Sequence, residues 1–256
     1  MLTQRRPAFR LLETLLWRPG RGYYLRHGHL RRLRHSAEYF DFAVDMDAIR
    51  AALEEHAADW GCGNEAELNR LLIHPLLPEL GEGQGMRACA GARNHNPHNP
   101  SSHVSNYRVR LLVSADGAIE IQATPLPKVD KRPWRVALAP EPIDPADPFL
   151  YHKTTHRAVY ETAHATHPDA DDVLLWNPRG ELTEATIANL AVRIEDRWLT
   201  PPIACGLLPG VMRAHLLRHG VLTEAVITRD MLAAAEEIAL INSVRGWLPA
   251  ELLHDT

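Results

Sequence analysis

The sequence predicts an α+β protein with two domains. The chain has 256 residues, of which 45% are hydrophobic, and this is enough to bury a sizeable core and to form two modest domains. Strand-like segments and amphipathic helical segments both occur along it. Seven of the nineteen prolines lie between residues 124 and 148, which indicates an interdomain connection. We place the boundary near Pro127, with an N-terminal α/β domain over residues 1–127 and a C-terminal domain over residues 128–256.

The N-terminal domain is predicted to begin with a hairpin and helices. Residues 9–17 alternate loosely between apolar and polar types, residues 18–22 form a turn, and residues 23–25 complete the hairpin. In residues 29–40, the apolar side chains fall on one helical face. Residues 47–56 and 65–76 have the same amphipathic pattern and predict two more helices.

A second hairpin is predicted between residues 107–113 and 118–123. The two segments are joined by Asp116-Gly117, the strongest hairpin signal in the chain. Arg108 and Arg110 alternate with apolar residues, so their side chains should point to one face of the sheet.

The passage from residue 81 to residue 102 is predicted to be a polar loop. Its GEGQGM segment lacks the preceding strand and the following lysine of a phosphate-binding loop. His95, His98 and His103 have irregular spacing and no neighbouring acid or cysteine, so we predict no metal site. Because a long loop in a compact domain is often functional, we expect this one to border the substrate entrance.

The C-terminal domain is predicted to be mostly strands with short helices. Strands are expected at residues 134–139, 173–176, 191–194, 198–200 and 238–241, and helices at residues 211–219 and 229–237. Gly220 ends the first of these helices, and Thr228 caps the second.

Composition narrows the class of protein. The formal net charge is −4 and arginines are interspersed with acids, which argues against a nucleic-acid-binding protein. Cys62, Cys89 and Cys205 are well separated, which is typical of a reducing cytoplasm without disulfides. No segment approaches the ~20 apolar residues of a membrane span, and the N-terminal apolar stretch is too short for a signal peptide. We therefore expect a soluble, cytoplasmic protein that binds neither nucleic acid nor a membrane.

Three features of the C-terminal half have the chemistry that a pyridoxal phosphate (PLP) enzyme needs. Such an enzyme requires an amine that bonds to the cofactor, an acid that faces the pyridine nitrogen, and donors that hold the phosphate. Lys153 supplies an amine and Glu184 a carboxylate. Pro209-Gly210 precedes a short helix, whose first N–H groups and dipole attract anions.

Four motifs resemble the class IV (fold-type IV) PLP enzymes, namely HKTTHR, GELTEATIANL, TPPIACGLLPGVMR and INSVRGW. This group contains the D-amino-acid and branched-chain aminotransferases and aminodeoxychorismate lyase. The residues of the four motifs are most similar to those of lyase-like domains. The resemblance covers nearly the whole chain and is strongest from Leu150 to Trp247. It implies a small N-terminal α/β sandwich, a C-terminal pseudo-barrel domain that binds PLP, and a homodimer.

The resemblance also assigns roles to individual residues. Lys153 is the catalytic lysine that bonds to the cofactor, and Glu184 is the partner of the pyridine nitrogen. Arg32, in the motif His29-Leu30-Arg31-Arg32-Leu33, resembles the arginine that grips the phosphate. Further phosphate contacts are implied for the Val211 and Met212 backbone N–H groups and for the Ser243 hydroxyl. Arg110, Arg157 and Arg245 are candidates for binding substrate.

Simpler interpretations of these residues are also open. Lys153 could be an ordinary surface lysine before a helix, with Thr154 and Thr155 as caps. Arg32, Arg110 and Arg245 could be solvated surface charges. Asn189 is expected to satisfy local backbone groups.

The resemblance implies a 4-amino-4-deoxychorismate lyase that gives 4-aminobenzoate and pyruvate for folate synthesis. The alternative is a class IV aminotransferase that acts on D-amino or branched-chain amino acids with 2-oxoglutarate. Leu12 stands where D-amino-acid aminotransferases carry a carboxylate-binding tyrosine, and three arginines suit a substrate with two carboxylates, so the lyase is favoured. A catalytically silent partner subunit is disfavoured because Lys153, Glu184 and Arg32 are all present. The chain also starts late relative to this family, which implies a trimmed N-terminal domain.

Overall fold

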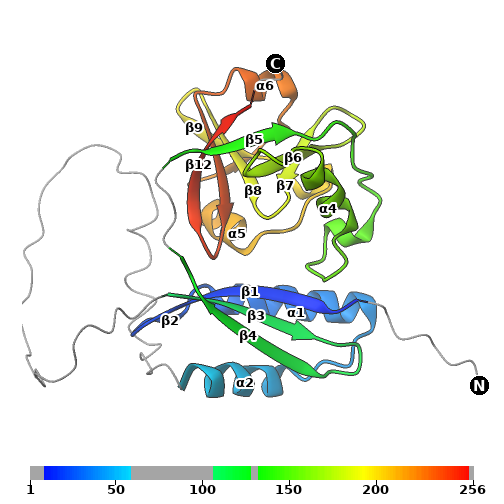
Figure 1. Cartoon of the computed structure of the whole chain (residues 1–256), viewed down its shortest axis with the longest axis vertical. Coiled ribbons are helices and arrows are strands. Elements are labelled where there is room, and N and C mark those ends of the chain that lie inside the picture. Colours follow the sequence, from blue (N-terminus) through cyan, green and yellow to red (C-terminus); the bar gives the residue numbers. More distant parts are fainter. Residues whose placement is uncertain (1–8, 59–105, 128–131, 254–256) are drawn as a thin grey trace, which may run out of the picture.

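The computed structural model describes residues 9–58, 106–127 and 132–253 of the chain. They form two parts, each built around its own sheet (Figure 1). Strand β4 (Ile119–Pro125) belongs to the first sheet and strand β5 (Trp134–Leu138) to the second, so the chain passes from one part to the other between them. The domain boundary at residue 127 itself stays a prediction. The expected helix at residues 65–76, the loop at residues 81–102 and the histidines 95, 98 and 103 lie outside the described residues.

The first part contains an antiparallel sheet of four strands in the order β2-β1-β3-β4. The strands are β1 (Leu11–Arg18), β2 (Gly22–Tyr23), β3 (Tyr107–Val113) and β4 (Ile119–Pro125). Both predicted hairpins are therefore confirmed. Gly117 in the second turn has a φ of +84°, a conformation that glycine adopts without strain.

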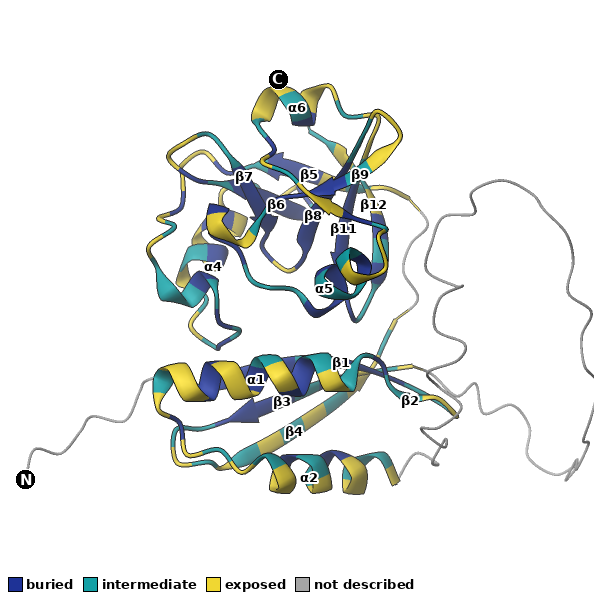
Figure 2. Cartoon of the chain, turned by 180° about the vertical axis from the view of Figure 1, so that it is seen from behind, coloured by how far each residue is buried: buried dark blue, intermediate teal, exposed yellow. Residues whose placement is uncertain are grey.

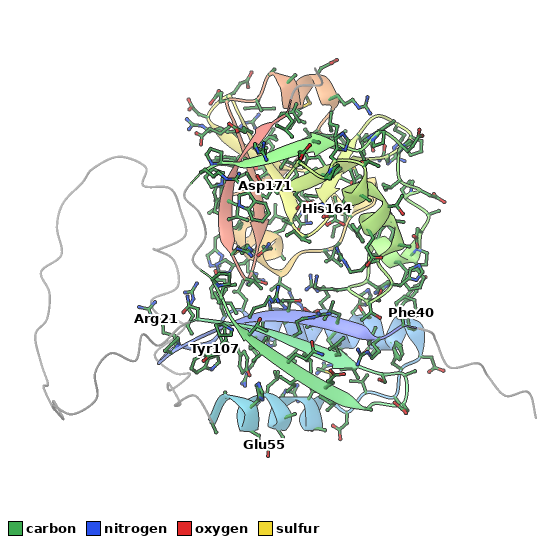
Figure 3. The ribbon with its side chains drawn as sticks, viewed as in Figure 1. Arg21, Phe40, Glu55, Tyr107, His164 and Asp171 are labelled. Atoms are coloured by element: carbon green, nitrogen blue, oxygen red, sulfur yellow. The ribbon has the colours of Figure 1, made fainter. Side chains whose placement is uncertain are left out.

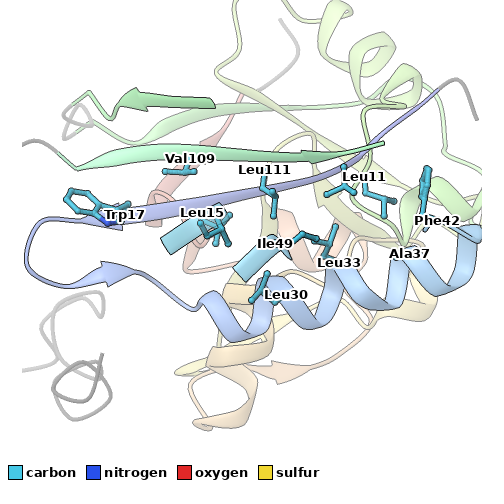
Figure 4. Close-up of a cluster of buried hydrophobic side chains, with 12 residues drawn as sticks. Leu11, Leu15, Trp17, Leu30, Leu33, Ala37, Phe42, Ile49, Val109 and Leu111 are labelled. Carbon is cyan, nitrogen blue, oxygen red and sulfur yellow. The ribbon is translucent and has the colours of Figure 1, made fainter. Parts of the chain in front are cut away.

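Helices α1 (Arg26–Phe40) and α2 (Met46–Ala58) cover one face of this sheet. Leu33 of α1 and Ile49 of α2 pack against Leu11, Leu15 and Leu111 of the strands (Figure 4). Because side chains alternate along a strand, Leu12 and Thr14 of β1 point to the opposite face of the sheet, toward the second part. One sheet thus has a core face and a face available to a binding site.

The second part is a mixed sheet whose strands close into a pseudo-barrel. Its order is β10-β9-β8-β11-β12-β5-β6-β7, and an additional β7–β8 pairing joins β8, β11, β12, β5, β6 and β7 into a ring. The strands are β5 (Trp134–Leu138), β6 (Asp172–Trp176), β7 (Leu182–Ala185), β8 (Asn189–Ile194), β9 (Arg197–Thr200), β10 (Thr223–Glu224), β11 (Glu237–Asn242) and β12 (Gly246–Leu252). The strands of the ring are mostly buried (Figure 2). The α+β class and the pseudo-barrel of the C-terminal part, both expected from the sequence, are confirmed.

Short helices cover the pseudo-barrel. They are η1 (Pro148–Leu150), α4 (Ala158–Ala165), η2 (Ile203–Cys205), α5 (Val211–Arg218) and α6 (Arg229–Ala233). The predicted helix at residues 229–237 was too long, because Glu237 pairs with Arg193 and begins β11. Thr228 caps α6 as expected, accepting a hydrogen bond from the Met231 N–H. None of the helices described here is long and apolar enough to cross a membrane.

The two parts are joined by main-chain hydrogen bonds. The Leu12 N–H donates to the carbonyl of Lys153 at 2.9 Å, and the Thr155 N–H donates to the carbonyl of Arg10 at the same distance. Helices α1 and α5 also meet closely, since a Cβ on Gly28 would lie 2.6 Å from Val211 Cγ1. These contacts hold β1 and α1 against the segments that carry Lys153 and Val211.

Replacing Leu33 with alanine should destabilise the first part, because this side chain is 1% exposed and fills the layer between α1 and the sheet. We expect Leu33→Ala to lower the free energy of unfolding by about 2–5 kcal/mol in urea denaturation. Glu55 points outward from α2 (Figure 3), so Glu55→Ala should change it by no more than about 0.5 kcal/mol. Equal effects of the two substitutions would contradict the described core.

Candidate active site

A cavity of about 440 Å³ lies between the two parts. Leu12, Thr14, Arg108 and Arg110 line it from the first sheet, and most of its other walls come from the second part. All nine residues that the sequence analysis assigned to a site line this cavity: Arg32, Arg110, Lys153, Arg157, Glu184, Val211, Met212, Ser243 and Arg245. The fold therefore brings together residues that are more than 200 positions apart in the sequence.

Lys153 lies in the cavity wall and is held there by its own backbone. Its carbonyl accepts from Leu12, and the neighbouring Thr155 hydroxyl accepts from the Arg10 N–H at 2.9 Å. Burial and then the nearby Arg32 lower the pKa of the Lys153 amine to about 8, while Glu13 partly opposes the shift. The interpretation as an ordinary capped surface lysine is wrong, because α4 begins only at Ala158. A buried amine with a lowered pKa is available as a nucleophile and base near neutral pH.

Glu184 is a buried carboxylate in the wall of the same cavity as Lys153. It is 4% exposed and accepts hydrogen bonds from Tyr160 Oη at 2.8 Å, the Leu208 N–H at 3.0 Å and Asn189 Nδ2 at 3.1 Å. Burial raises the pKa of Glu184 to about 7, although these donors and the cations nearby act in the opposite direction. Glu181, by contrast, binds Arg179 outside the cavity. Of the two acids in the motif, Glu184 is the one that can face a bound ring.

Asn189 connects Glu184 to the loop before α5. Its Nδ2 donates both to Glu184 and to the carbonyl of Leu208, at 2.9 Å in the second case. Asn189 thus satisfies a backbone carbonyl as expected, but one that lies 19 positions away in the sequence, and its bond to Glu184 was not expected. A Cβ on Gly210 would lie 1.7 Å from Asn189 Oδ1, so only glycine fits there.

The start of α5 forms an end of the cavity suited to an anion. Gly210 is the N-cap and supplies no side-chain acceptor, so the first turn, with Val211 and Met212, presents its N–H groups and the positive end of the helix dipole. Arg32 Nη1 donates to the carbonyl of Pro209 at 3.2 Å, which brings its guanidinium beside this turn. Ser243, 8% exposed, adds a hydroxyl to the cavity wall. Together these groups can hold a phosphate.

Arginines from separate elements give the cavity a positive charge. Arg157 donates to the carbonyl of Thr186 at 2.6 Å and lies over the ring of Tyr160. Arg245 lies 5.6 Å from the ring centroid of Trp134. Among the charged side chains of the wall are six cations, Arg32, Arg108, Arg110, Lys153, Arg157 and Arg245, and one carboxylate, Glu184. Such a cavity favours a ligand with several negative charges.

An aromatic wall next to Lys153 was not predicted from the sequence. His152 is 5% exposed, stacks on Tyr39 at 4.3 Å between ring centroids and lies 3.0 Å from Ser36 Oγ through its Nδ1. Burial, and then the neighbouring His35, lower the pKa of His152 to about 4. His152 is therefore uncharged at neutral pH and contributes shape to the wall, not charge.

Two further residues with clear polar roles were also missed. Tyr160, on α4, donates to Glu184, and Glu13, on β1, binds Arg32 and His29. Glu13 has a signal in the sequence, because it is a single acid within the apolar strand segment Leu-Leu-Glu-Thr-Leu-Leu. An acid in such a segment must find a buried partner.

Comparisons with known proteins agree with this site. A family model described as amino-transferase class IV matches residues 10–253. A Schizosaccharomyces pombe protein named "Putative aminodeoxychorismate lyase" is 36% identical over 146 residues, which cover 54% of this chain and 63% of that protein. The "Aminodeoxychorismate lyase" of Saccharomyces cerevisiae is 29% identical over 275 residues, which cover 88% and 66% respectively. The chain thus spans slightly less than two thirds of the length of either relative.

Solved structures share the fold. The crystal structure of a "Putative amino-acid aminotransferase" from Mesorhizobium loti is 31% identical with a TM-score of 0.74, and the match covers 96% of this chain and 100% of that one. The PLP-bound form of a hypothetical aminotransferase from Mycobacterium tuberculosis has a TM-score of 0.65 at 19% identity, covering 95% of this chain and 81% of that one. At this identity the second match reports the fold alone.

In the protein without ligand, the Lys153 amine should titrate near pH 8, not near 10.5, because burial and Arg32 disfavour its charged form. Reductive methylation with formaldehyde and cyanoborohydride reports the fraction of neutral amine, and peptide mapping over a pH series would give the midpoint for each lysine. Lys128 and Lys131, the other lysines of the chain, serve as internal references. A Lys153 midpoint above pH 10 would contradict the described environment.

Proposed function

Because the chain belongs to the class IV aminotransferase family, we propose that it is a PLP-dependent lyase that converts 4-amino-4-deoxychorismate into 4-aminobenzoate and pyruvate. The observation that carries this proposal is the cavity, in which the Lys153 amine is surrounded by arginines from both parts of the molecule. The substrate has one amine and two carboxylates, which match this distribution of charge. The names of the two yeast relatives also support the lyase.

The residues of the cavity fit the chemistry of PLP. Lys153 provides the amine with a lowered pKa, and Glu184 provides the acid for the pyridine nitrogen. Arg32, Ser243 and the first turn of α5, with Val211 and Met212, would hold the phosphate, and the lack of a side chain at Gly210 lets the start of α5 lie against Asn189. When bound, the cofactor would supply an aldehyde that captures the substrate amine and a ring that withdraws electrons from the adjacent carbon.

The side chains then divide the work of the reaction. Arg110, Arg157 and Arg245 bind the carboxylates and orient the substrate. Lys153 Nζ, uncharged in a useful fraction of molecules near pH 8, accepts the proton from C4 of the substrate. Glu184 Oε holds positive charge at the pyridine nitrogen, with Tyr160 and Asn189 fixing the carboxylate. Loss of the C4 proton and cleavage of the C3–O bond make the carbocycle aromatic, and the enolpyruvate that leaves takes up a proton at its methylene carbon to become pyruvate.

The second candidate is an aminotransferase, favoured by the name of the Mesorhizobium loti protein, which matches over its whole length. The same Lys153 amine would move a proton from Cα of an amino acid. Leu12 argues against the D-amino-acid branch, because it lines the cavity where a carboxylate-binding hydroxyl would be needed and offers only an apolar side chain. The homodimer, the cytoplasmic location and the role in folate synthesis stay predictions.

Glu184→Gln should separate cofactor binding from turnover. The amide keeps the shape of the carboxylate but cannot hold a proton at the pyridine nitrogen, so PLP should still bind while turnover falls by about 10²-fold or more. Borohydride reduction and peptide mapping should find the cofactor on Lys153 in both proteins. Glu181→Gln, three residues earlier and outside the cavity, is the matched control. Undiminished turnover in Glu184→Gln would mean that another acid faces the ring.

A paired assay on one preparation distinguishes the lyase from the aminotransferase. We expect 4-aminobenzoate from 4-amino-4-deoxychorismate made in situ from chorismate and glutamine by a synthase. A panel of D- and L-amino acids with 2-oxoglutarate should give much slower turnover, because single carboxylates leave some arginines of the cavity unpaired. Rapid amino transfer without 4-aminobenzoate would overturn the lyase and favour the second candidate.

A further inference from the structure

Glu13 is a buried carboxylate that no step of the proposed reaction uses. It lies in the middle of β1, is 1% exposed and points to the core side of the sheet, between Leu11 and Leu15. Burial alone would raise the pKa of Glu13, but Arg32 and His29 outweigh it and hold the pKa at about 2. The side chain is therefore a permanent negative charge inside the protein.

The Glu13 carboxylate is held by two parallel hydrogen bonds from the Arg32 guanidinium. Arg32 Nε donates to Glu13 Oε1 at 2.8 Å and Arg32 Nη2 donates to Glu13 Oε2 at 2.7 Å. His29 Nδ1 lies 2.7 Å from the same Oε2. His29 and Arg32 are three positions apart on α1 and so share one face of the helix, which explains why both meet a single carboxylate. The His-Leu-Arg-Arg-Leu motif thus contains two partners of Glu13.

These two hydrogen bonds leave part of Arg32 available. A guanidinium has five N–H donors in a fixed plane, and Arg32 uses two on Glu13 and one on the carbonyl of Pro209. One donor remains on each terminal nitrogen. Because Arg32 lines the cavity beside the first turn of α5, the direction of these donors depends on the two contacts that fix the plane, Glu13 on one edge and Pro209 on the other.

We propose that Glu13 is a positioning residue, which holds Arg32 so that its remaining N–H groups meet a phosphate group bound at the start of α5. The inference rests on the proposed cofactor and extends it to a residue that does not touch the cofactor. His29 completes the arrangement by occupying the Oε2 atom from the side of α1. The role is geometric, since a carboxylate near an anion site opposes binding of the anion by its charge alone.

Because the charge of Glu13 and its positioning of Arg32 act on phosphate binding in opposite directions, the direction of change on neutralising Glu13 distinguishes the two roles. If Glu13 acted only through its charge, its neutralisation would strengthen binding of a phosphate. If it positions Arg32, neutralisation leaves an amide donor facing an arginine donor, the guanidinium plane is released, and phosphate binding weakens. A ligand without the phosphate should respond to neither effect.

The test compares PLP with pyridoxal, which lacks the phosphate, by absorbance titration of the protein freed of cofactor. Glu13→Gln keeps the length of the side chain and removes its charge, whereas Glu13→Asp keeps the charge and withdraws it by one methylene. We expect both variants to bind PLP about tenfold or more weakly and pyridoxal within about threefold of the unaltered protein. Glu120→Gln, which breaks an exposed carboxylate–arginine pair with Arg10 on the same sheet, should change neither.

Several results would overturn the inference. These are unchanged or tighter PLP binding in Glu13→Gln, normal binding in Glu13→Asp, and equal losses for PLP and pyridoxal, which would mean a role in the fold alone. If Glu13→Gln does not fold, Glu13→Asp carries the comparison. Failure of the unaltered protein to bind PLP at all would overturn the proposed function itself, a result distinct from loss of selectivity in the variants.

Discussion

The main-chain bonds between β1 and the segment around Lys153 are the contacts on which the site depends. Because Leu12 donates to the Lys153 carbonyl and Thr155 donates to the Arg10 carbonyl, the first sheet and the pseudo-barrel are held in a fixed relation at the lysine. β1 then contributes to both sides of the molecule. Its core face carries Glu13, which binds α1, and its other face carries Leu12 and Thr14, which line the cavity. Such a connection helps to keep a site between two sheets in one geometry.

The cavity keeps charged groups in positions that burial disfavours. Lys153 binds fewer protons in the folded chain than in the unfolded chain between about pH 8 and 10.5, so its contribution to stability rises with pH through that window. Glu184 binds more protons in the folded chain between 4.5 and about 7, so stability falls as pH rises through that window. Both penalties are therefore present together between about pH 7 and 8. A ligand that brings negative charge near Lys153 and Arg32 and a proton donor beside Glu184 would offset part of these penalties.

Features that depend on residues close together in the chain were predicted from the sequence. The apolar periodicity of α1, the Asp116-Gly117 turn and the motifs around Lys153 and Glu184 each lie within a few residues, and the structure places them as expected. The remaining features depend on partners far apart in the chain. Tyr160 and Glu184 are 24 positions apart and Glu13 and Arg32 are 19 apart, so no local pattern joins them. The end of α6 was missed for the same reason, because it is the pairing of Glu237 with Arg193 that starts β11.

We infer that specificity in this cavity depends on which parts of the molecule supply its arginines. The amine, the acid and the anion end of the cavity serve any reaction of a PLP enzyme, so they do not choose between substrates. Arg110 belongs to β3 of the first part, whereas Arg157 and Arg245 belong to the second, where Arg157 donates to the Thr186 carbonyl and Arg245 lies near the ring of Trp134. A substrate with two separated carboxylates can pair with cations from both parts at once, while a substrate with one carboxylate leaves some of these half-buried arginines without an anionic partner. We therefore propose that the choice of reaction depends on the distribution of arginines around Lys153.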